Sequence, residues 1–181
     1  MALTATMYTF DVQLSDVDRG VYETVSVRAA CHPSETEEYL WTRVLAYCLE
    51  YQEGITFSRG LSTPDEPAVM VRDLTGAITA WIEVGAPDAA RLHRASKGAP
   101  RVVVYTHRDA RLLQRQYAGE RIHRAESIAI RAIDRALLEA LVARLDRRVA
   151  LELSVADAML WVTIGGEVLS GEVASYPIMM A

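Results

Sequence analysis

The segment from Asp65 to Lys97 constrains the fold of this chain more than any other stretch. Two short apolar runs, 68–71 and 78–84, flank a turn sequence at 73–76 that ends in glycine. A Gly- and Asp-containing turn between two such runs is typical of a β-hairpin. The segment therefore predicts a hairpin followed by a helix, and its second run is the most strand-like part of the chain.

The second predicted strand contains one residue that an ordinary strand does not explain, Glu83. Side chains alternate between the two faces of a strand, so Glu83 shares its face with Thr79 and Trp81. The other face is apolar throughout, with Ile78, Ala80, Ile82 and Val84. A glutamate beside a tryptophan is explained by a metal, by an ion pair with one of the chain's arginines, or by a half-exposed strand position.

A metal site would explain Glu83, because other acids lie at the start of the neighbouring strand. Asp65 and Glu66 precede the first strand of the hairpin, and neighbouring strands can bring these carboxylates to one point. Mg²⁺ takes oxygen ligands of this kind, usually one or two carboxylates with water and a substrate phosphate. We expect a Mg²⁺ site here, and an arginine ion pair of Glu83 is the alternative.

Short motifs distributed over the chain add a family resemblance. They are HPSET at 32–36, SRGL at 58–61, DEP at 65–67, WIEVG at 81–85 and PD at 87–88. The order of acid, strand, turn, strand with apolar-Glu-apolar, and basic helix resembles the PD-(D/E)XK nuclease core. The motifs together more closely resemble the YaeQ family. This resemblance implies a bacterial protein with a compact variant of the nuclease core, one domain over residues 1–181, and no settled function.

The chain departs from the nuclease motif at Gly85, where the superfamily has a lysine. A basic side chain from the following helix would have to replace it. Arg94 is better placed than Lys97, since each further helical turn adds about 5.4 Å. Arg91 on the same helix is a candidate for binding phosphate. Arginine stays protonated, so it can offset phosphate charge but cannot act as a base. The candidate catalytic residues are Glu83, Arg94 and Lys97.

A helix is predicted from Ser34, because Ser34 and Glu37 form a capping box ahead of apolar residues at helical spacing. Glu35 then lies in the first turn, where the nuclease resemblance implies that an acid joins the metal site. The alternative is that Glu35 only favours the positive end of the helix. Arg59, in a strand predicted at 55–61, could meet either the acids or a phosphate.

Composition indicates a globular protein. The chain has 181 residues with 51% hydrophobic content, which is enough for one domain with a sizeable core. No segment resembles a signal peptide or approaches the roughly 20 apolar residues of a membrane span. We expect a soluble cytoplasmic protein with no membrane partner. Cys31 and Cys48 form no CxxC motif, so zinc is not expected, and Cys48 fits a core helix position.

The net charge of −5 argues against wide coverage by nucleic acid. Charge is nevertheless uneven along the chain. Residues 91–148 carry 13 Arg and 1 Lys against 6 acidic residues, a net of +8, and the remainder has a net of −13. The basic segment could bind nucleic acid weakly beside an acidic site, or the two regions could simply pair with each other.

The rest of the chain predicts further strands and helices. Strands are expected at 5–14, 21–29, 101–107, 126–133, 149–155, 159–164 and 167–175, and helices at 108–118 and 134–145. The helix at 108–118 should turn Leu112, Leu113 and Tyr117 inward. An apolar strand after a helix suggests a parallel crossover. The fold class is therefore α/β, with a mixed sheet, helices on at least one face, and added antiparallel β-hairpins at both ends.

The motifs leave two functions open. The sequence has no Walker loop, dinucleotide motif or nucleophile elbow. The first function is a Mg²⁺-dependent phosphodiesterase or nuclease-like site, with metal ligands Glu35, Asp65, Glu66 and Glu83. The alternative is a non-catalytic binding or regulatory protein that keeps the nuclease-like fold and has lost the catalytic lysine. The sequence does not decide between them, and it does not predict an oligomeric state.

Overall fold

The computed structural model describes residues 4–58 and 65–179. In chain order the elements are β1 (Thr6–Asp16), β2 (Val21–Cys31), α1 (Glu37–Leu49), β3 (Ile55–Phe57), β4 (Val69–Arg72), β5 (Ile78–Val84), α2 (Ala89–Gly98), β6 (Arg101–Thr106), α3 (Ala110–Tyr117), a 3₁₀ turn η1 (Ala125–Ser127), β7 (Ala129–Ile133), α4 (Arg135–Val142), β8 (Arg148–Ala156), β9 (Met159–Ile164) and β10 (Glu167–Pro177). Within these two ranges no helix is long and apolar enough to cross a bilayer. The α/β fold class is confirmed.

All ten strands belong to one sheet, in the order β2-β1-β8-β9-β10-β7-β6-β5-β4-β3. The long strand β10 joins its two halves, since residues 167–172 pair with β9 and residues 173–177 pair with β7. The sheet is mixed, because β1 pairs with β8, β5 with β6 and β6 with β7 in parallel. The antiparallel hairpins predicted at both ends are present, as β1 with β2 and as β8 with β9 and β10, and they join each other within the same sheet. Their parallel junction, β1 with β8, joins distant segments and has no local turn signal in the sequence.

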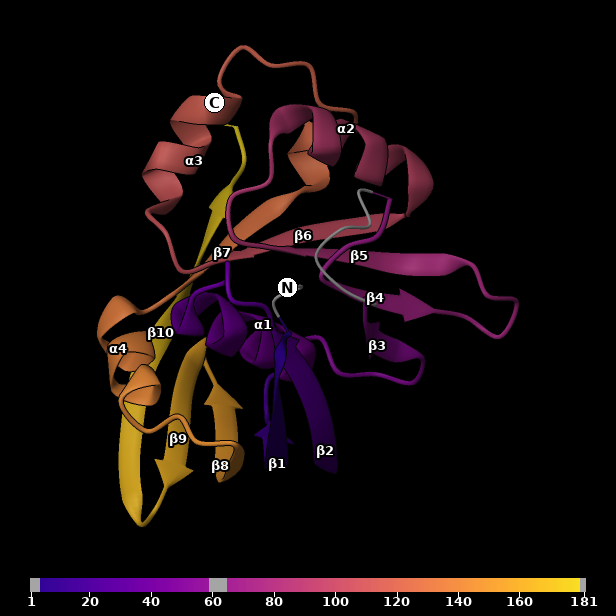
Figure 1. The fold of residues 1–181 in the computed structure, drawn as a ribbon. Helices are drawn as coiled ribbons and strands as arrows, with labels where there is room; N and C mark the ends of the chain where they lie inside the picture. Colours follow the sequence, from indigo (N-terminus) through magenta and orange to yellow (C-terminus); the bar gives the residue numbers. More distant parts are fainter. Residues whose placement is uncertain (1–3, 59–64, 180–181) are drawn as a thin grey trace.

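Helix α1 lies at the centre of the molecule, and the sheet bends around it (Figure 1). It contacts α4 and five strands, β2 to β6, including both edge strands of the sheet. Nearly every side chain from Leu40 to Leu49 is buried, and Trp41 packs edge-on against Phe10 with ring centroids 5.1 Å apart. A helix buried on all sides belongs to a core. The larger hydrophobic core forms around α1, and Cys48 lies in it as expected.

A second, smaller core lies on the opposite face of β5 to β7, under α2 and α3 (Figure 1). The predicted alternation along β5 is confirmed, because Ile82 faces the α1 core while Trp81 faces α2 and α3. Leu113 and Tyr117 are buried as expected. The prediction for Leu112 was wrong, since it is 51% exposed. Helix α3 begins at Ala110, so its sheet-facing side passes through Leu113 and Gln114 instead.

The start of α1 differs from the predicted capping box. Thr36 is the N-cap, and its Oγ1 accepts a hydrogen bond from the backbone N–H of Tyr39 at 3.1 Å. Ser34 instead contacts Nδ1 of His32 at 2.8 Å. The chain turns between these residues, with the N–H of Glu35 donating to the carbonyl of His32. Glu35 therefore lies in the loop before α1, not in the first turn as predicted.

Candidate functional site

Glu83 lies near the carboxyl end of β5 and is only 4% exposed. Its Oε1 accepts two hydrogen bonds, from the indole Nε1 of Trp81 and from Nε of Arg91, both at 2.6 Å. A buried carboxylate that is bonded to a guanidinium has its charge compensated. The arginine ion pair that the sequence left as an alternative is thus present in the structure.

Helix α2 positions Arg91 against the strand. Its N-cap is Asp88, whose Oδ1 accepts from the backbone N–H of Arg91 at 2.7 Å. The side chain of a first-turn residue leans toward the helix amino terminus, which here is the end of β5. The guanidinium also donates from Nη2 to the backbone carbonyl of Glu66 at 2.6 Å. Arg91 therefore connects α2, β5 and the segment that leads into β4.

The pKa of Glu83 reflects opposing influences. Burial raises it above the ordinary value, the indole of Trp81 and the guanidinium of Arg91 lower it, and the nearby charge of Asp88 raises it. Burial is the largest of these causes, as expected for a carboxyl removed from water. The two donors at 2.6 Å nevertheless favour the ionised carboxylate at neutral pH. The net effect is a raised pKa, and the 2.6 Å contact between Glu83 and Arg91 is one of the interactions that oppose it.

The remaining predicted acids have different surroundings. Oε1 of Glu35 accepts from the backbone N–H of His32 at 3.2 Å. Asp65 is exposed, and Glu66 is half-buried. The Oε2 atoms of Glu35 and Glu66 are buried and have no hydrogen-bond partner among the residues that the structure describes. These two oxygens are the only observation at the site that favours a bound cation.

Tyr39, in the first turn of α1, connects the predicted residues. Burial raises its pKa; the charges of Glu35 and Glu83 raise it further, and those of Arg43 and Arg91 lower it. The charges of two acids and two arginines therefore act on this tyrosine. Sequence reasoning missed Tyr39, because a tyrosine at a helical core position has no distinguishing signal.

The backbone conformation at Gly85, directly after β5, disfavours a side chain such as that of lysine. Its φ is +96°, a conformation that side-chain-bearing residues rarely adopt. A Cβ atom at this position would lie 3.4 Å from the ring of Tyr39. The backbone hydrogen bond from Gly85 N–H to the carbonyl of Tyr105, at 2.8 Å, holds this conformation. The local fold therefore favours glycine at this position over a residue with a side chain.

The predicted basic residues do not gather around Glu83. Arg94 and Lys97 are exposed on α2, and neither forms a hydrogen bond or ion pair with another residue in the described part of the chain. Arg59 lies outside the described residues. The basic side chain that contacts Glu83 is Arg91, which the sequence assigned to phosphate binding.

The possible ligand atoms around Glu83 can be compared with the ligand set that a metal ion requires. Across residues 4–58 and 65–179, no three Asp, Glu, His or Cys side chains form a group that could hold a metal ion. The guanidinium of Arg91 is already bonded to Oε1 of Glu83. The buried Oε2 atoms of Glu35 and Glu66 could accept bonds from a cation, but they do not form a ligand set by themselves.

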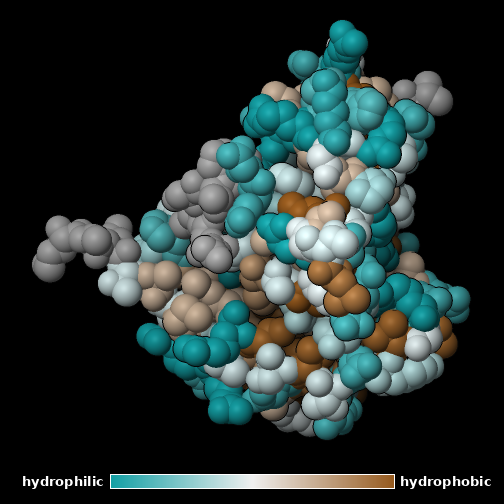
Figure 2. Space-filling view, turned by 90° about the vertical axis from the view of Figure 1, so that its right-hand side faces the viewer, coloured by the Kyte–Doolittle hydropathy of each residue, from teal (hydrophilic) through white to brown (hydrophobic). Residues whose placement is uncertain are grey.

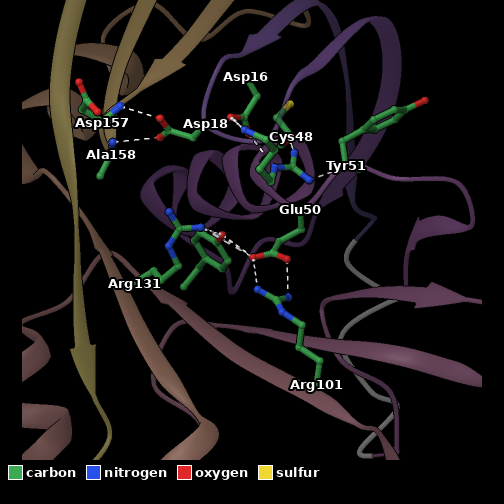
Figure 3. A network of polar contacts seen from close by, with 11 residues as sticks. Asp16, Asp18, Cys48, Glu50, Tyr51, Arg101, Arg131, Asp157 and Ala158 are labelled. Atoms are coloured by element: carbon green, nitrogen blue, oxygen red, sulfur yellow. Dashed lines mark hydrogen bonds and ion pairs between the residues drawn. The ribbon is translucent and has the colours of Figure 1, made fainter.

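A second buried acid, Glu50, forms the network in Figure 3. Arg101 donates from both terminal nitrogens to the Glu50 carboxylate, and the hydroxyl of Tyr105 donates to its Oε1 at 2.6 Å. Arg131 donates to the Tyr105 hydroxyl and lies 5.2 Å from the centre of its ring. The network was missed because its members come from separate segments with no shared sequence motif. It fixes the carboxyl end of α1 to β6 and β7.

Arg19 completes the carboxyl end of α1, where Cys48 and Tyr51 are labelled in Figure 3. It donates to the backbone carbonyls of Tyr51 at 2.9 Å and Cys48 at 3.2 Å. Its Nε also pairs at 2.8 Å with Asp16, which is 1% exposed. A cation at a helix carboxyl terminus favours the helix dipole and satisfies its last carbonyls. The contacts around Glu50 and Arg19 are internal, so we interpret them as structural.

Comparisons with known proteins identify relatives over nearly the whole chain. The family model described as "YaeQ protein" matches residues 1–173. The "Uncharacterized protein YaeQ" of Escherichia coli strain K12 is 33% identical over 165 residues, which cover 90% of this chain and 91% of that protein. The protein of the same name from Salmonella typhi is also 33% identical over 165 residues, with the same coverage.

Two solved structures have the same fold. The crystal structure of the YaeQ protein from Pseudomonas syringae has a TM-score of 0.86 and 34% identity, covering 94% of this chain and 95% of that one. The YaeQ protein from Xanthomonas axonopodis pv. citri has a TM-score of 0.86 and 31% identity, covering 95% and 98%.

Proposed function

Given that this chain belongs to the YaeQ family, we propose that it is a non-catalytic binding protein built on a variant of the PD-(D/E)XK nuclease core. The observation that carries the proposal is the Glu83–Arg91 ion pair, with 2.6 Å between Oε1 and Nε. Arg91 supplies the positive charge that a metal would otherwise supply to Glu83. A divalent cation would have to compete with an internal, partly buried guanidinium.

The conformation of Gly85 supports the same conclusion. A lysine here would need a positive φ, which costs roughly 1–2 kcal/mol for a residue with a side chain. Arg91 comes from α2 instead, and an arginine cannot take a proton from water at neutral pH. Position 85 therefore offers no side chain that could act as a general base.

The partner that suits the remaining surface is nucleic acid, bound weakly. Five exposed basic residues form what we call the basic surface, on α2, on α3 and in the loop after α3: Arg94, Lys97, Arg111, Arg115 and Arg121. The loop lies against α2, because the rings of His93 and His123 meet at 6.4 Å. Hydrophilic residues also cover the top of the molecule in Figure 2, where α2 lies. Clustered positive charge attracts phosphates without sequence preference.

A second function is favoured by one observation. The buried and unpartnered Oε2 atoms of Glu35 and Glu66 could ligate Mg²⁺ if Arg91 moved away from Glu83. In that arrangement Asp65 would be a further ligand, and Arg94 or Lys97 could offset phosphate charge. This would give a Mg²⁺-dependent phosphodiesterase in which Mg²⁺ supplies Lewis acidity.

The experiment that separates the two functions is a cleavage and binding assay on the same substrates. Labelled single-stranded and duplex DNA and RNA are incubated with the protein, with and without Mg²⁺. We expect no Mg²⁺-dependent cleavage. We also expect weak binding whose log K falls with log salt by about 0.9 for each phosphate contact on duplex DNA. Cleavage by the parent that disappears in Glu83→Ala would establish the phosphodiesterase instead.

Variants test the basic surface in the same assay. Arg115→Glu should weaken binding and reduce the salt slope, because it removes one phosphate contact. Arg147→Glu is the matched control, since Arg147 is also exposed but lies before β8, outside the basic surface. Equal effects of the two variants would show that only net charge matters and that the basic surface is not the binding site.

A further inference from the structure

A cavity of about 430 Å³ lies between α1, α4 and the loop after β6. Glu38 from the first turn of α1 lines it, together with His107 and Arg108 from the loop and Arg135 and Glu139 from α4. This volume is within the range of about 300–1,000 Å³ that small-molecule sites occupy. It does not include Glu83 or Arg91, so it is separate from the site described above.

The position of the cavity suits a ligand. Strands β5, β6 and β7 are parallel, and the cavity-lining loop begins directly after the last residue of β6, Thr106. Ile133, the last residue of β7, also lines the cavity. Ligands of α/β sheets bind outside the carboxyl ends of parallel strands, where loops and helix starts converge. With Leu138 on α4, Ile133 gives the cavity an apolar part.

His107 has a ring nitrogen whose hydrogen-bonding capacity is not satisfied by the described residues. Its Nδ1 is buried and has no hydrogen-bond partner within the described ranges. Its ring packs edge-on against Tyr39, with centroids 6.3 Å apart, which fixes the ring in place. Burial lowers the pKa of His107 and the charge of Arg108 lowers it further, while the charge of Glu38 raises it. Leaving a buried polar atom unpaired costs about 1–3 kcal/mol, which a ligand could recover.

The charges around the cavity are of both signs. Arg135 and Glu139 already pair with each other at 3.1 Å, and Asp109 caps α3 by accepting from the N–H of Arg111 at 2.8 Å. Glu38 and Arg108 differ from these residues. Within residues 4–58 and 65–179, neither side chain forms a hydrogen bond or an ion pair. One carboxylate and one guanidinium therefore line this cavity without a partner among the described residues.

We propose that this cavity binds a small zwitterion of the α-amino acid class. The carboxylate of the ligand would pair with Arg108, and its ammonium group would pair with Glu38. His107 Nδ1 would complete the polar contacts, and a side chain would rest against Ile133 and Leu138. The acidic side chains that line the cavity would repel a purely anionic ligand, and its arginines would repel a purely cationic one. Both classes are therefore disfavoured. This inference does not depend on the proposed nucleic-acid binding.

The test is an NMR titration of the ¹⁵N-labelled protein with each of the standard α-amino acids. For at least one of them we expect saturable shifts of the amides of the loop after β6 and of the first turns of α1 and α4, with a Kd of about 1 mM or tighter. The ¹⁵N shift of His107 Nδ1 should change at the same ligand concentration. If no amino acid perturbs these signals at concentrations up to about 10 mM, the proposal is overturned.

Ligand analogues and variants test the zwitterion directly. The amine and the carboxylic acid that correspond to the best amino acid should each bind at least about 10-fold more weakly, a loss of about 1.4 kcal/mol. Arg108→Ala and Glu38→Gln should also weaken binding about 10-fold or more. Arg115→Ala is the matched control, because Arg115 is exposed on α3 and does not line this cavity. Equal binding of either analogue, or unchanged binding by both variants, would refute the assignment.

Discussion

At Gly85 the backbone limits which side chains the end of β5 can carry. We expect Gly85→Ala to lower the free energy of unfolding by about 1–2 kcal/mol, because alanine is strained at a φ of +96°. The added Cβ meets the ring of Tyr39 at ordinary contact distance, so backbone strain and not a clash is the cause. Denaturant unfolding measures the change.

Gly98→Ala is the matched control for this substitution. Gly98 ends α2, has no positive φ, and has open space where a Cβ would be. Alanine there should leave stability unchanged or raise it slightly, by about 0.4–1 kcal/mol. Equal effects at Gly85 and Gly98 would show that the positive φ at Gly85 is not a real constraint.

Glu50 is a buried acid whose loss should destabilise the fold clearly. Glu50→Ala would leave the Tyr105 hydroxyl and parts of Arg101 and Arg131 without their acceptor. Breaking a buried pair costs about 3–5 kcal/mol, and we expect about 3 because the Arg101 side chain is 49% exposed. Glu139→Ala, which breaks the exposed pair with Arg135, should cost about 0.5 kcal/mol or less. A similar small loss for both variants would mean that the Glu50 network is not stabilising.

Among the helices and strands, the amino-terminal cap of α1 gives the most informative test. We expect Thr36→Ala to destabilise the protein by about 1 kcal/mol, because it removes the side-chain cap of Tyr39 N–H. Ser34→Ala should cost less, since it removes only an exposed contact with His32. Thermal melts of the two variants compare them. A larger loss of stability for Ser34→Ala would show that Ser34 caps the helix, as the sequence predicted.

The same helix shows what sequence could and could not predict. Its apolar spacing predicted a helix over these residues, because burial of one side chain per turn leaves a regular pattern. Its boundary could not be read, since Ser34 and Thr36 are both good caps and tertiary packing selects between them. The burial of α1 on all sides also could not be foreseen, because the parallel pairing of β1 with β8 bends the sheet around it.

At the candidate site, too, some features could be predicted from the sequence and others could not. Period-two alternation correctly placed Glu83 on the face of β5 opposite the α1 core. The partner of Glu83 could not be chosen from sequence, since Arg91, Arg94 and Lys97 all lie within two turns of one helix. The choice depends on the N-cap at Asp88, which sets the direction in which Arg91 extends.

Across the whole molecule, part of the positive charge of residues 91–148 gathers on one side of the sheet. The basic surface lies on α2, α3 and the loop that follows, on one side of β5 to β7. The α1 core and the strands β1, β2, β8 and β9 lie on the other side of the molecule (Figure 1). The net charge of −5 therefore does not prevent a local attraction for phosphate.

Arg91, not a metal ion, compensates Glu83 in the function proposed above. Thermal melts of the parent and of Glu83→Ala, each with and without Mg²⁺, would distinguish the two. Removing Glu83 takes the carboxylate away from Nε of the partly buried Arg91, so we expect a loss of about 3–5 kcal/mol. That loss corresponds to about 2–4 °C in melting temperature per kcal/mol for a chain of this size.

Mg²⁺ should change the melting temperature of neither protein, because a ligand stabilises only the folded state that binds it. The contradicting result has two parts. Without metal, Glu83→Ala would be as stable as the parent or more stable. This is the result expected when the removed residue serves function at the cost of stability. Mg²⁺ would then stabilise the parent and have no effect on Glu83→Ala.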